Sequence, residues 1–186
     1  MKKARKLLIT CSILISTFVL TAYQIQQQSV YPEEINWRSH FLAAPDKHSP
    51  FYALTATRWH YSYNASVRGN DLHIDFKFSA GVDPEQSWVK LNQLKGAESK
   101  RKLLMHEQGH VNINFLLLKD GEQKIRFQRY TVRNYKKSIL ENANKVSAYY
   151  RDMQKRYDEE TKHGSDDAQQ ERWNKLIAEQ LRKFIK

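Results

Sequence analysis

The sequence predicts an α+β fold, in which a small antiparallel sheet is followed by a long helical hairpin and a C-terminal helix. Alternating apolar residues on both sides of a turn near residue 69 predict the sheet. Apolar residues at three- and four-residue steps beyond residue 100 predict the helices. Without its first 22 residues the chain keeps roughly 160 of its 186, enough for one sizeable core. No internal repeat or low-complexity linker divides it, so we expect a single domain over residues 23–186.

The N-terminal segment predicts the compartment. Four basic residues within the first six positions precede an apolar run from Leu7 to Ala22, which is too short to span a membrane comfortably. This pattern is typical of a secretory signal peptide over residues 1–22, and an uncleaved N-terminal membrane anchor is the alternative. Cys11, the only cysteine, lies in this run, so no disulfide or cysteine-based zinc site is expected beyond it. We expect a secreted or periplasmic protein, or one anchored to the inner membrane.

Two alternating segments predict an antiparallel hairpin. Aromatic residues alternate with polar ones from Trp59 to Tyr63, and apolar residues alternate with polar ones from Leu72 to Phe78. Between these segments, Arg68-Gly69-Asn70-Asp71 has the composition of a tight turn. Ser87-Trp88-Val89 predicts a further short strand, and the chain beyond it is expected to be almost wholly helical to Lys186.

The sequence His106-Glu107-Gln108-Gly109-His110 is an HExxH motif. Residues four apart share a helix face, so both imidazoles can bind one metal ion, and this spacing is typical of zinc hydrolases. Glu107 lies about a quarter-turn round the helix, where its carboxylate is free to act as a general base on a water molecule. A shuffled chain of this composition would contain the motif with a probability of roughly 1.5%, so the match favours a metal site.

The helix that carries the motif is predicted to be buried. It has more apolar residues than an exposed helix does, among them Leu103, Leu104, Val111, Ile113 and the run from Phe115 to Leu118. Both imidazoles would then point into the protein and need partners there. Gly109 costs about 1 kcal/mol relative to alanine inside a helix. Simple tolerance of this cost is one explanation, and close approach by another segment or by the substrate is the functional one.

A second long helix should return toward the motif. Apolar residues recur at helical spacing from Val132 to Tyr157. If the motif helix continues to about residue 130 and the chain turns near residues 133–134, the outward and return paths are of similar length. A turn at residues 119–121 would make them unequal. The amphipathic tail from Trp173 onward is expected to pack on this helical pair, and a membrane-surface role is the alternative.

A catalytic zinc site normally has three protein ligands, so a third must come from another segment. His163 is the favoured residue, because it follows the returning helix and directly precedes a helix N-cap pattern beginning at Ser165. Glu160 and Asp158 are the carboxylate alternatives. Tyr157 is a candidate to stabilise the oxyanion that forms during amide hydrolysis.

Together with the HEQGH core, several segments resemble a family of bacterial predicted secreted zinc-dependent proteases of uncharacterised function. They are Ile35-Asn36-Trp37, the strand from Thr55 to Tyr63, Ser87-Trp88-Val89, Leu104-Met105, Tyr157-Asp158, Thr161-Lys162-His163-Gly164, Gln170 and Trp173. The resemblance covers most of the chain beyond the N-terminal segment and implies a zincin-like metallopeptidase with zinc as its cofactor. It implies His106, His110 and His163 as metal ligands and Glu107 as the base.

We therefore expect a zinc-dependent hydrolase of the cell envelope that acts on a peptide or protein substrate. The predicted strand over residues 72–78 is a candidate to pair with an extended substrate. A non-catalytic envelope protein on the same scaffold and a cell-wall amidase are the alternatives. The net charge of +11 falls to +7 without the four basic residues at positions 2, 3, 5 and 6, and the remainder is spread along the chain. We therefore expect no nucleic-acid partner, whereas membrane association through the N-terminal segment is compatible with the sequence.

Overall fold

The structure of the protein is a computed structural model that describes residues 31–185, so the predictions for residues 1–22 lie outside it. The elements in chain order are α1 (Trp37–His40), β1 (Ala53–Leu54), β2 (Thr57–Arg68), β3 (Asp71–Val82), β4 (Trp88–Val89), a 3-10 helix (Leu91–Gln93), α2 (Gly96–Arg126), α3 (Tyr135–Thr161) and α4 (Asp167–Leu181). This arrangement confirms the predicted α+β fold. Within residues 31–185, no helix has both the length and the apolar character needed to cross a membrane.

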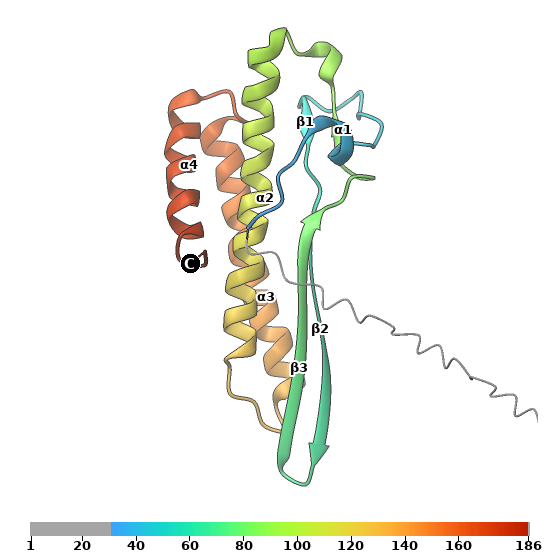
Figure 1. The fold of residues 1–186 in the computed structure, drawn as a ribbon, viewed down its shortest axis with the longest axis vertical. Helices are drawn as coiled ribbons and strands as arrows, with labels where there is room; N and C mark the ends of the chain where they lie inside the picture. Colours follow the sequence, from blue (N-terminus) through green and yellow to red (C-terminus); the bar gives the residue numbers. More distant parts are fainter. Residues whose placement is uncertain (1–30, 186) are drawn as a thin grey trace, which may run out of the picture.

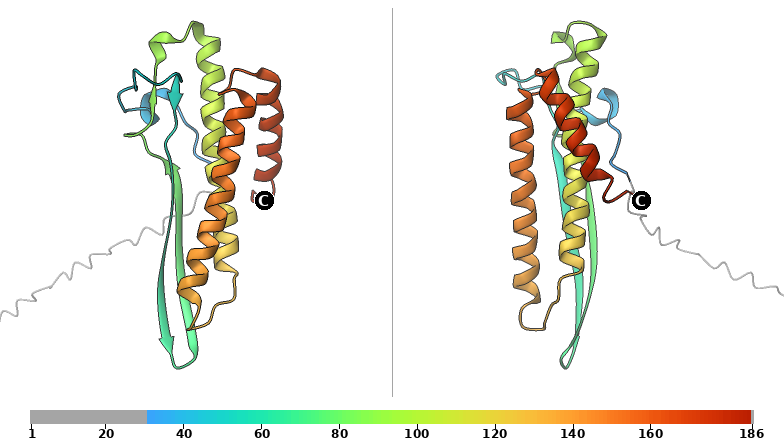
Figure 2. Two further views of the ribbon diagram at one scale, coloured as in Figure 1. Left: turned by 180° about the vertical axis from the view of Figure 1, so that it is seen from behind. Right: turned by 90° about the vertical axis from the view of Figure 1, so that its left-hand side faces the viewer.

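Helix α2 is the central element, because it contacts α3, α4 and the strands β1, β2 and β3. Figure 1 shows α4 on one side of α2 and the hairpin of β2 and β3 on the other. The views of Figure 2 show α3 running alongside α2, with α4 packed against the half of this pair that is distant from the hairpin turn. The motif helix is therefore covered on several sides, as its apolar composition predicted.

The predicted hairpin is confirmed and is longer than its apolar pattern indicated. Strands β2 and β3 pair from Thr57 opposite Val82 to Arg68 opposite Asp71, and Gly69 has a φ of +61° in the two-residue turn. The aromatic face of the hairpin packs on the C-terminal end of α2 and the N-terminal part of α3, around a core of Phe76, Ile125, Ile139 and Ala143. The tip of the hairpin extends beyond the ends of the helices (Figure 1).

A second small sheet lies next to the motif helix. Its strands β1 and β4 pair antiparallel, with Ala53 opposite Val89 and Leu54 opposite Trp88. The sheet region thus consists of two two-stranded sheets. Strand β4 corresponds to the short strand that the sequence predicted at Trp88 and Val89, and its partner β1 contacts α2.

The turn between the two long helices lies close to its predicted position. Helix α2 ends at Arg126, a few residues before the expected end near residue 130, and α3 begins at Tyr135. Asn134 fixes the turn, because its side-chain oxygen accepts from the Thr131 N–H at 2.8 Å. The alternative turn at residues 119–121 is not formed, because these residues lie within α2. A Cβ atom at Gly121 would come within 2.9 Å of Trp59. The long return path brings the C-terminal end of α3 back to the motif.

A tight corner joins α3 to α4. Lys162, His163 and Gly164 all have positive φ values, of 50°, 54° and 79°, so three successive residues are left-handed. The Asp166 side chain accepts from the Gln169 N–H and caps α4, one residue after Ser165, where the sequence pattern placed the start of the cap. Helix α4 packs on α2 and α3 mainly through Trp173 and Ile177, which confirms the expected position of the tail.

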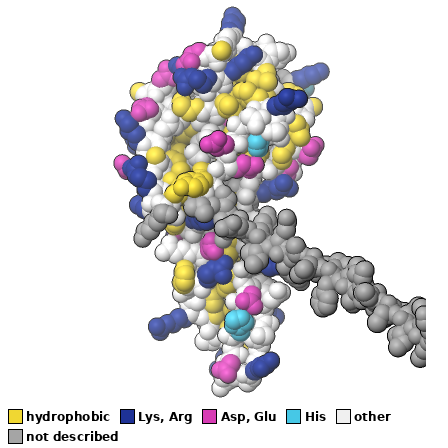
Figure 3. Space-filling view, in the orientation of Figure 1, with side chains coloured by type: hydrophobic (Ala, Val, Ile, Leu, Met, Phe, Trp, Pro, Cys, Tyr) yellow, Lys and Arg dark blue, Asp and Glu magenta, His cyan; other side chains and the backbone are white. Residues whose placement is uncertain are grey.

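The positive charge of the described residues does not gather in one place on the face that Figure 3 shows. Lys and Arg side chains are distributed around this face, and Asp and Glu side chains lie between them. Several are paired on helix surfaces, for example Lys124 with Asp120 and Arg126 with Glu122. This distribution agrees with the charge spacing in the sequence.

Truncating Ile125 tests the packing of the hairpin on the helices. Ile125 is 0% exposed, so Ile125→Ala removes apolar contacts and leaves a cavity. We expect the free energy of unfolding in urea to fall by about 2–5 kcal/mol. Phe127→Ala is the control, because Phe127 is 78% exposed and its truncation should change stability by about 0.5 kcal/mol or less. Equal effects of the two variants would contradict this packing.

Candidate metal centre

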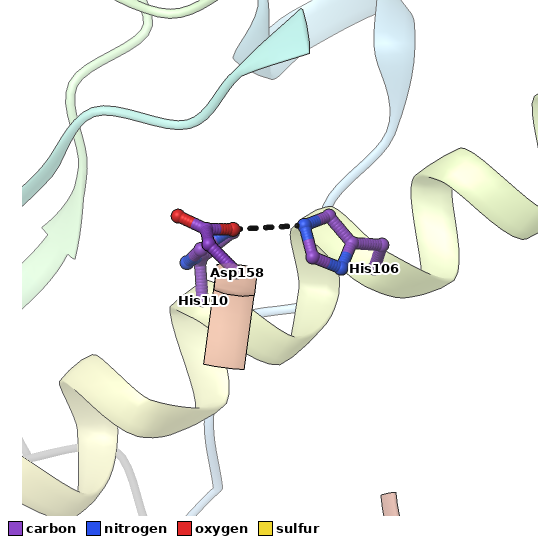
Figure 4. Close-up of side chains that lie close together, drawn as sticks. All are labelled: His106, His110 and Asp158. Atoms are coloured by element: carbon purple, nitrogen blue, oxygen red, sulfur yellow. Dashed lines mark hydrogen bonds and ion pairs between the residues drawn. The ribbon is translucent and has the colours of Figure 1, made fainter. Parts of the chain in front are cut away.

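The two motif histidines lie on one face of α2 and meet a carboxylate from α3. Asp158 Oδ1 is 3.1 Å from His106 Nε2 and 3.0 Å from His110 Nε2. Figure 4 shows both imidazoles leaving α2 toward Asp158. The potential ligand atoms of these three residues all lie within 4.8 Å of one another, and His106 is buried. Nitrogen and oxygen donors in this arrangement could hold a metal ion.

Charge couples the three side chains. Burial alone would lower the pKa of the His110 imidazole, but the hydrogen bond to Asp158 and the nearby Glu107 outweigh it and raise this pKa to about 9. Burial likewise opposes ionisation of Asp158. The hydrogen bonds with His106 and His110 nevertheless hold the pKa of the Asp158 carboxyl well below its usual range. The site therefore carries an ionised carboxylate that favours a positive charge beside it, which a proton or a metal ion can supply.

Glu107 lies next to this group but is held by a different segment. The Thr55 hydroxyl, just beyond β1, donates to Glu107 Oε2 at 2.6 Å. Glu107 itself is buried and does not belong to the group of close metal-ligand atoms. Glu107 therefore lies beside the possible ligand group without being part of it.

A cleft of about 470 Å³ opens onto the group. One wall is formed by residues 50–55 and Thr57, and His106, Glu107, His110, Asp158 and His163 line the remainder with Leu103, Gln154, Lys162 and Ser165. The segment beside the cleft is therefore β1 with its flanking residues. Strand 72–78, which the sequence offered as a partner for substrate, does not line the cleft, because its apolar face packs on the far end of the helices.

The two other ligand candidates, His163 and Glu160, lie outside the group of three. His163 lines the cleft with its side chain 44% exposed, and its Nδ1 is 3.5 Å from Asp158 Oδ1. Its ring packs on Phe51, with ring centroids 4.1 Å apart. It lies beside the group of three without joining it. The Glu160 carboxylate instead accepts from Trp173 Nε1 at 2.9 Å, so it faces α4 and not the cleft.

The predicted oxyanion role of Tyr157 does not fit its position. Tyr157 is fully buried, and its hydroxyl donates to the His106 carbonyl oxygen at 2.9 Å and accepts from Gln170 Nε2 at 2.7 Å. Burial raises the pKa of this phenol above its usual value. Its ring stacks on His106 with centroids 4.7 Å apart. The phenol therefore packs against the motif helix and is not among the residues that line the cleft.

Gly109 permits this contact. A Cβ atom at position 109 would overlap the Tyr157 ring and hydroxyl. The close approach that the sequence predicted at Gly109 is therefore made by another segment, α3. A similar restriction applies at Gly164, where a Cβ atom would come within 2.8 Å of His106.

Three residues of the site were not predicted to have a role there. They are Thr55, which holds Glu107, and Gln154 and Gln170, whose Oε1 atoms lie 2.6 Å from His110 Nδ1 and 3.1 Å from His106 Nδ1. Helical periodicity places Gln154 four residues before Asp158 on the same face of α3, and this spacing was the available signal. Thr55 and Gln170 occur in the segments that carry the family resemblance.

Comparison with known proteins gives one match. The model of a family described as "Bacterial protein of unknown function (DUF922)" matches residues 21–164. This range includes the hairpin, the motif helix, Asp158 and His163. No curated protein and no solved structure matches the chain. The match agrees with the predicted resemblance to an uncharacterised bacterial family, and the description assigns that family no activity.

The raised pKa of His110 predicts how stability depends on pH in metal-free protein. A folded-state pKa of about 9, against 6.5 in the unfolded chain, means that the stabilisation is fully present below pH 6.5. It is lost as pH rises through 9. The lowered pKa of Asp158 acts at the other end, because its contribution is lost as pH falls below 3.8.

We therefore expect the free energy of unfolding of chelator-treated protein to fall by up to a few kcal/mol between pH 6.5 and 9.5. Urea denaturation at a series of pH values measures this change. His110→Gln is the comparison, because it removes the titrating group, and its stability should fall much less over the same range. The same decrease in both proteins would assign the pH dependence to other groups.

Proposed function

We propose that this chain, which belongs to the bacterial family of unknown function DUF922, is a zinc-dependent hydrolase that cleaves peptide bonds. One observation carries the proposal. The Glu107 carboxylate lines the same cleft as the ligand group of His106, His110 and Asp158, lies outside that group and accepts a hydrogen bond from Thr55. A purely structural metal site has no need of such a carboxylate. The HEQGH core and its flanking segments, which resemble secreted zinc-dependent proteases, support the same activity.

The donor set fits zinc. Two imidazole nitrogens and one carboxylate oxygen are common zinc ligands, and three protein ligands leave a position open for water or substrate. Asp158 is the third ligand in this proposal, because its Oδ1 lies about 3 Å from both Nε2 atoms. His163 is then a neighbour of the ligand, close enough to Asp158 to orient its carboxylate.

A bound Zn²⁺ would polarise the substrate carbonyl and make a water molecule more acidic. The protein supplies the remaining groups. Glu107 takes a proton from the attacking water and passes it to the leaving amine, and Thr55 fixes one oxygen of its carboxylate. The rigid packing of Tyr157 behind His106 keeps the motif helix in place during this transfer.

The cleft wall indicates the kind of substrate. Phe51, Tyr52 and Leu54 are exposed along the wall that β1 and its preceding residues form. An extended peptide with apolar side chains beside the cleaved bond would cover this surface. We place the enzyme in the cell envelope, because the basic and apolar residues of the first 22 positions have the pattern of an export signal or anchor.

Zinc binding separates the two candidates for the third ligand. We expect about one zinc per chain, with the dissociation constant measured by competition with a chromophoric chelator. Loss of a residue that hydrogen-bonds a metal ligand typically weakens metal binding about 10- to 100-fold. Asp158→Ala should weaken zinc binding by more than this, whereas His163→Ala should stay within this range. Circular dichroism confirms that each variant is folded. Strong loss in His163→Ala with retention in Asp158→Ala would instead give a three-histidine site.

Replacement of the base tests catalysis. We expect Glu107→Gln to keep its zinc and to lose about 100-fold or more of its hydrolytic rate, because the amide cannot accept the proton. Release of new amino termini from a defined peptide library, with peptidoglycan fragments as a second set, measures this rate. Glu85→Gln is the matched control, since Glu85 is exposed and does not line the cleft. Undiminished hydrolysis by Glu107→Gln would rule out the proposed base, and cleavage of the peptidoglycan fragments alone would indicate an amidase.

A further inference from the structure

Each motif histidine is held by a glutamine from a different helix. Gln154 of α3 places its Oε1 2.6 Å from His110 Nδ1, and Gln170 of α4 places its Oε1 3.1 Å from His106 Nδ1. These contacts involve the imidazole nitrogens that face away from Asp158. The two glutamines therefore act on the side of each ring that a metal ion would not occupy.

The hydrogen bonds of Gln154 determine which end of its amide faces the imidazole. Its Nε2 donates to the His110 backbone carbonyl at 2.9 Å. A carbonyl oxygen only accepts hydrogen bonds, so the amide nitrogen must be at this end and the amide oxygen at the other. Because that oxygen also only accepts, His110 Nδ1 must carry the hydrogen. Gln154 thus holds both the ring and the backbone of the same histidine.

Gln170 reaches the same result through Tyr157. Its Nε2 donates to Asn174 Oδ1 at 2.9 Å and to the Tyr157 hydroxyl at 2.7 Å, and that hydroxyl donates to the His106 carbonyl. The amide oxygen is therefore the atom that faces His106 Nδ1. Thr161 Oγ1, 3.5 Å from the same nitrogen, already donates to the Tyr157 carbonyl at 2.6 Å and can only accept here. His106 Nδ1 is therefore surrounded by acceptors and must carry a hydrogen.

A neutral imidazole with its hydrogen on Nδ1 has a lone pair on Nε2. In both histidines Nε2 lies about 3 Å from the Asp158 carboxylate oxygen. In metal-free protein a proton between Nε2 and this carboxylate makes the contact favourable. In the neutral rings, the two lone pairs and the anionic oxygen are positioned to bind a cation that lies between them. We propose, on the basis of the function proposed above, that Gln154 and Gln170 are positioning residues that fix the Nδ1–H tautomer of both histidines and so direct Nε2 to a divalent metal ion.

The neutral amides also set the charge of the centre. Histidine ligands of zinc often donate to a carboxylate, which makes the ring a stronger donor to the metal. Here both partners are uncharged, and Asp158 is the single anion of the ligand group. A divalent ion in this group would keep a net charge of +1, which favours polarisation of a substrate carbonyl.

Variants of Gln154 test this inference, because Gln154 is only partly buried and tolerates substitution better than Gln170. We expect Gln154→Leu to weaken Zn²⁺ binding by about 10- to 100-fold. Gln154→Glu should weaken binding less than Gln154→Leu does, because a carboxylate still accepts from Nδ1–H but cannot donate to the His110 carbonyl. Gln123→Leu is the control on α2, where Gln123 is exposed. Thermal unfolding followed by circular dichroism shows that all variants fold.

The tautomer is measured directly by ¹⁵N-detected NMR of the histidine side chains in the zinc-loaded protein. We expect protonated Nδ1 and metal-bound Nε2 at His106 and His110, with the Nδ1–H signal of His110 lost or shifted in Gln154→Leu. Wild-type zinc affinity and an unchanged His110 signal in Gln154→Leu would overturn the positioning role while leaving the proposed function intact. Failure of the wild-type protein to bind Zn²⁺ would overturn the proposed function and this inference with it.

Discussion

The contact between Gly109 and Tyr157 is the constraint on which the rest of the site depends. It lets α3 approach α2 so closely that the Tyr157 ring lies against His106 and its hydroxyl reaches the His106 backbone. Asp158 is the next residue along α3 and is therefore delivered to the two imidazoles. Any side chain at position 109 would push the two helices apart and move the carboxylate with them.

The ligand group and the side chains that hydrogen-bond the site come from parts of the fold that are distant in sequence. His106 and His110 come from α2, Asp158 and Gln154 from α3, and Gln170 from α4. Thr55 adds the segment after β1. A metal ion bound here would stabilise the packing of all of these elements, because its ligands come together only in the folded chain. Folding and metal affinity should consequently be coupled in this protein.

The sequence predicted the parts of the fold that follow from periodicity and short motifs. Alternation predicted the hairpin, helical spacing predicted α2 and α3, and the HExxH spacing predicted the pairing of His106 with His110. The choice between Asp158 and His163 depended instead on where α3 ends. The helix ends at Thr161, and the left-handed corner that follows turns His163 out along the cleft wall while Asp158 stays on the helix face opposite the motif. In that corner Gly164 lies so close to His106 that a Cβ atom would come within 2.8 Å of it, and local sequence does not encode this long-range contact. Likewise, a threonine beyond β1 contacts Glu107 only because β1 pairs with β4 and lies against α2.

A crystal structure of the zinc-soaked protein, with anomalous data collected at the zinc absorption edge, tests the proposed metal site most directly. We expect one anomalous peak within about 2.0–2.2 Å of His106 Nε2, His110 Nε2 and an Asp158 carboxylate oxygen, with Glu107 outside the ligand group. The absence of a peak between these residues would contradict a metal centre there. A peak bound by His163 in place of Asp158 would contradict the ligand set assigned to it.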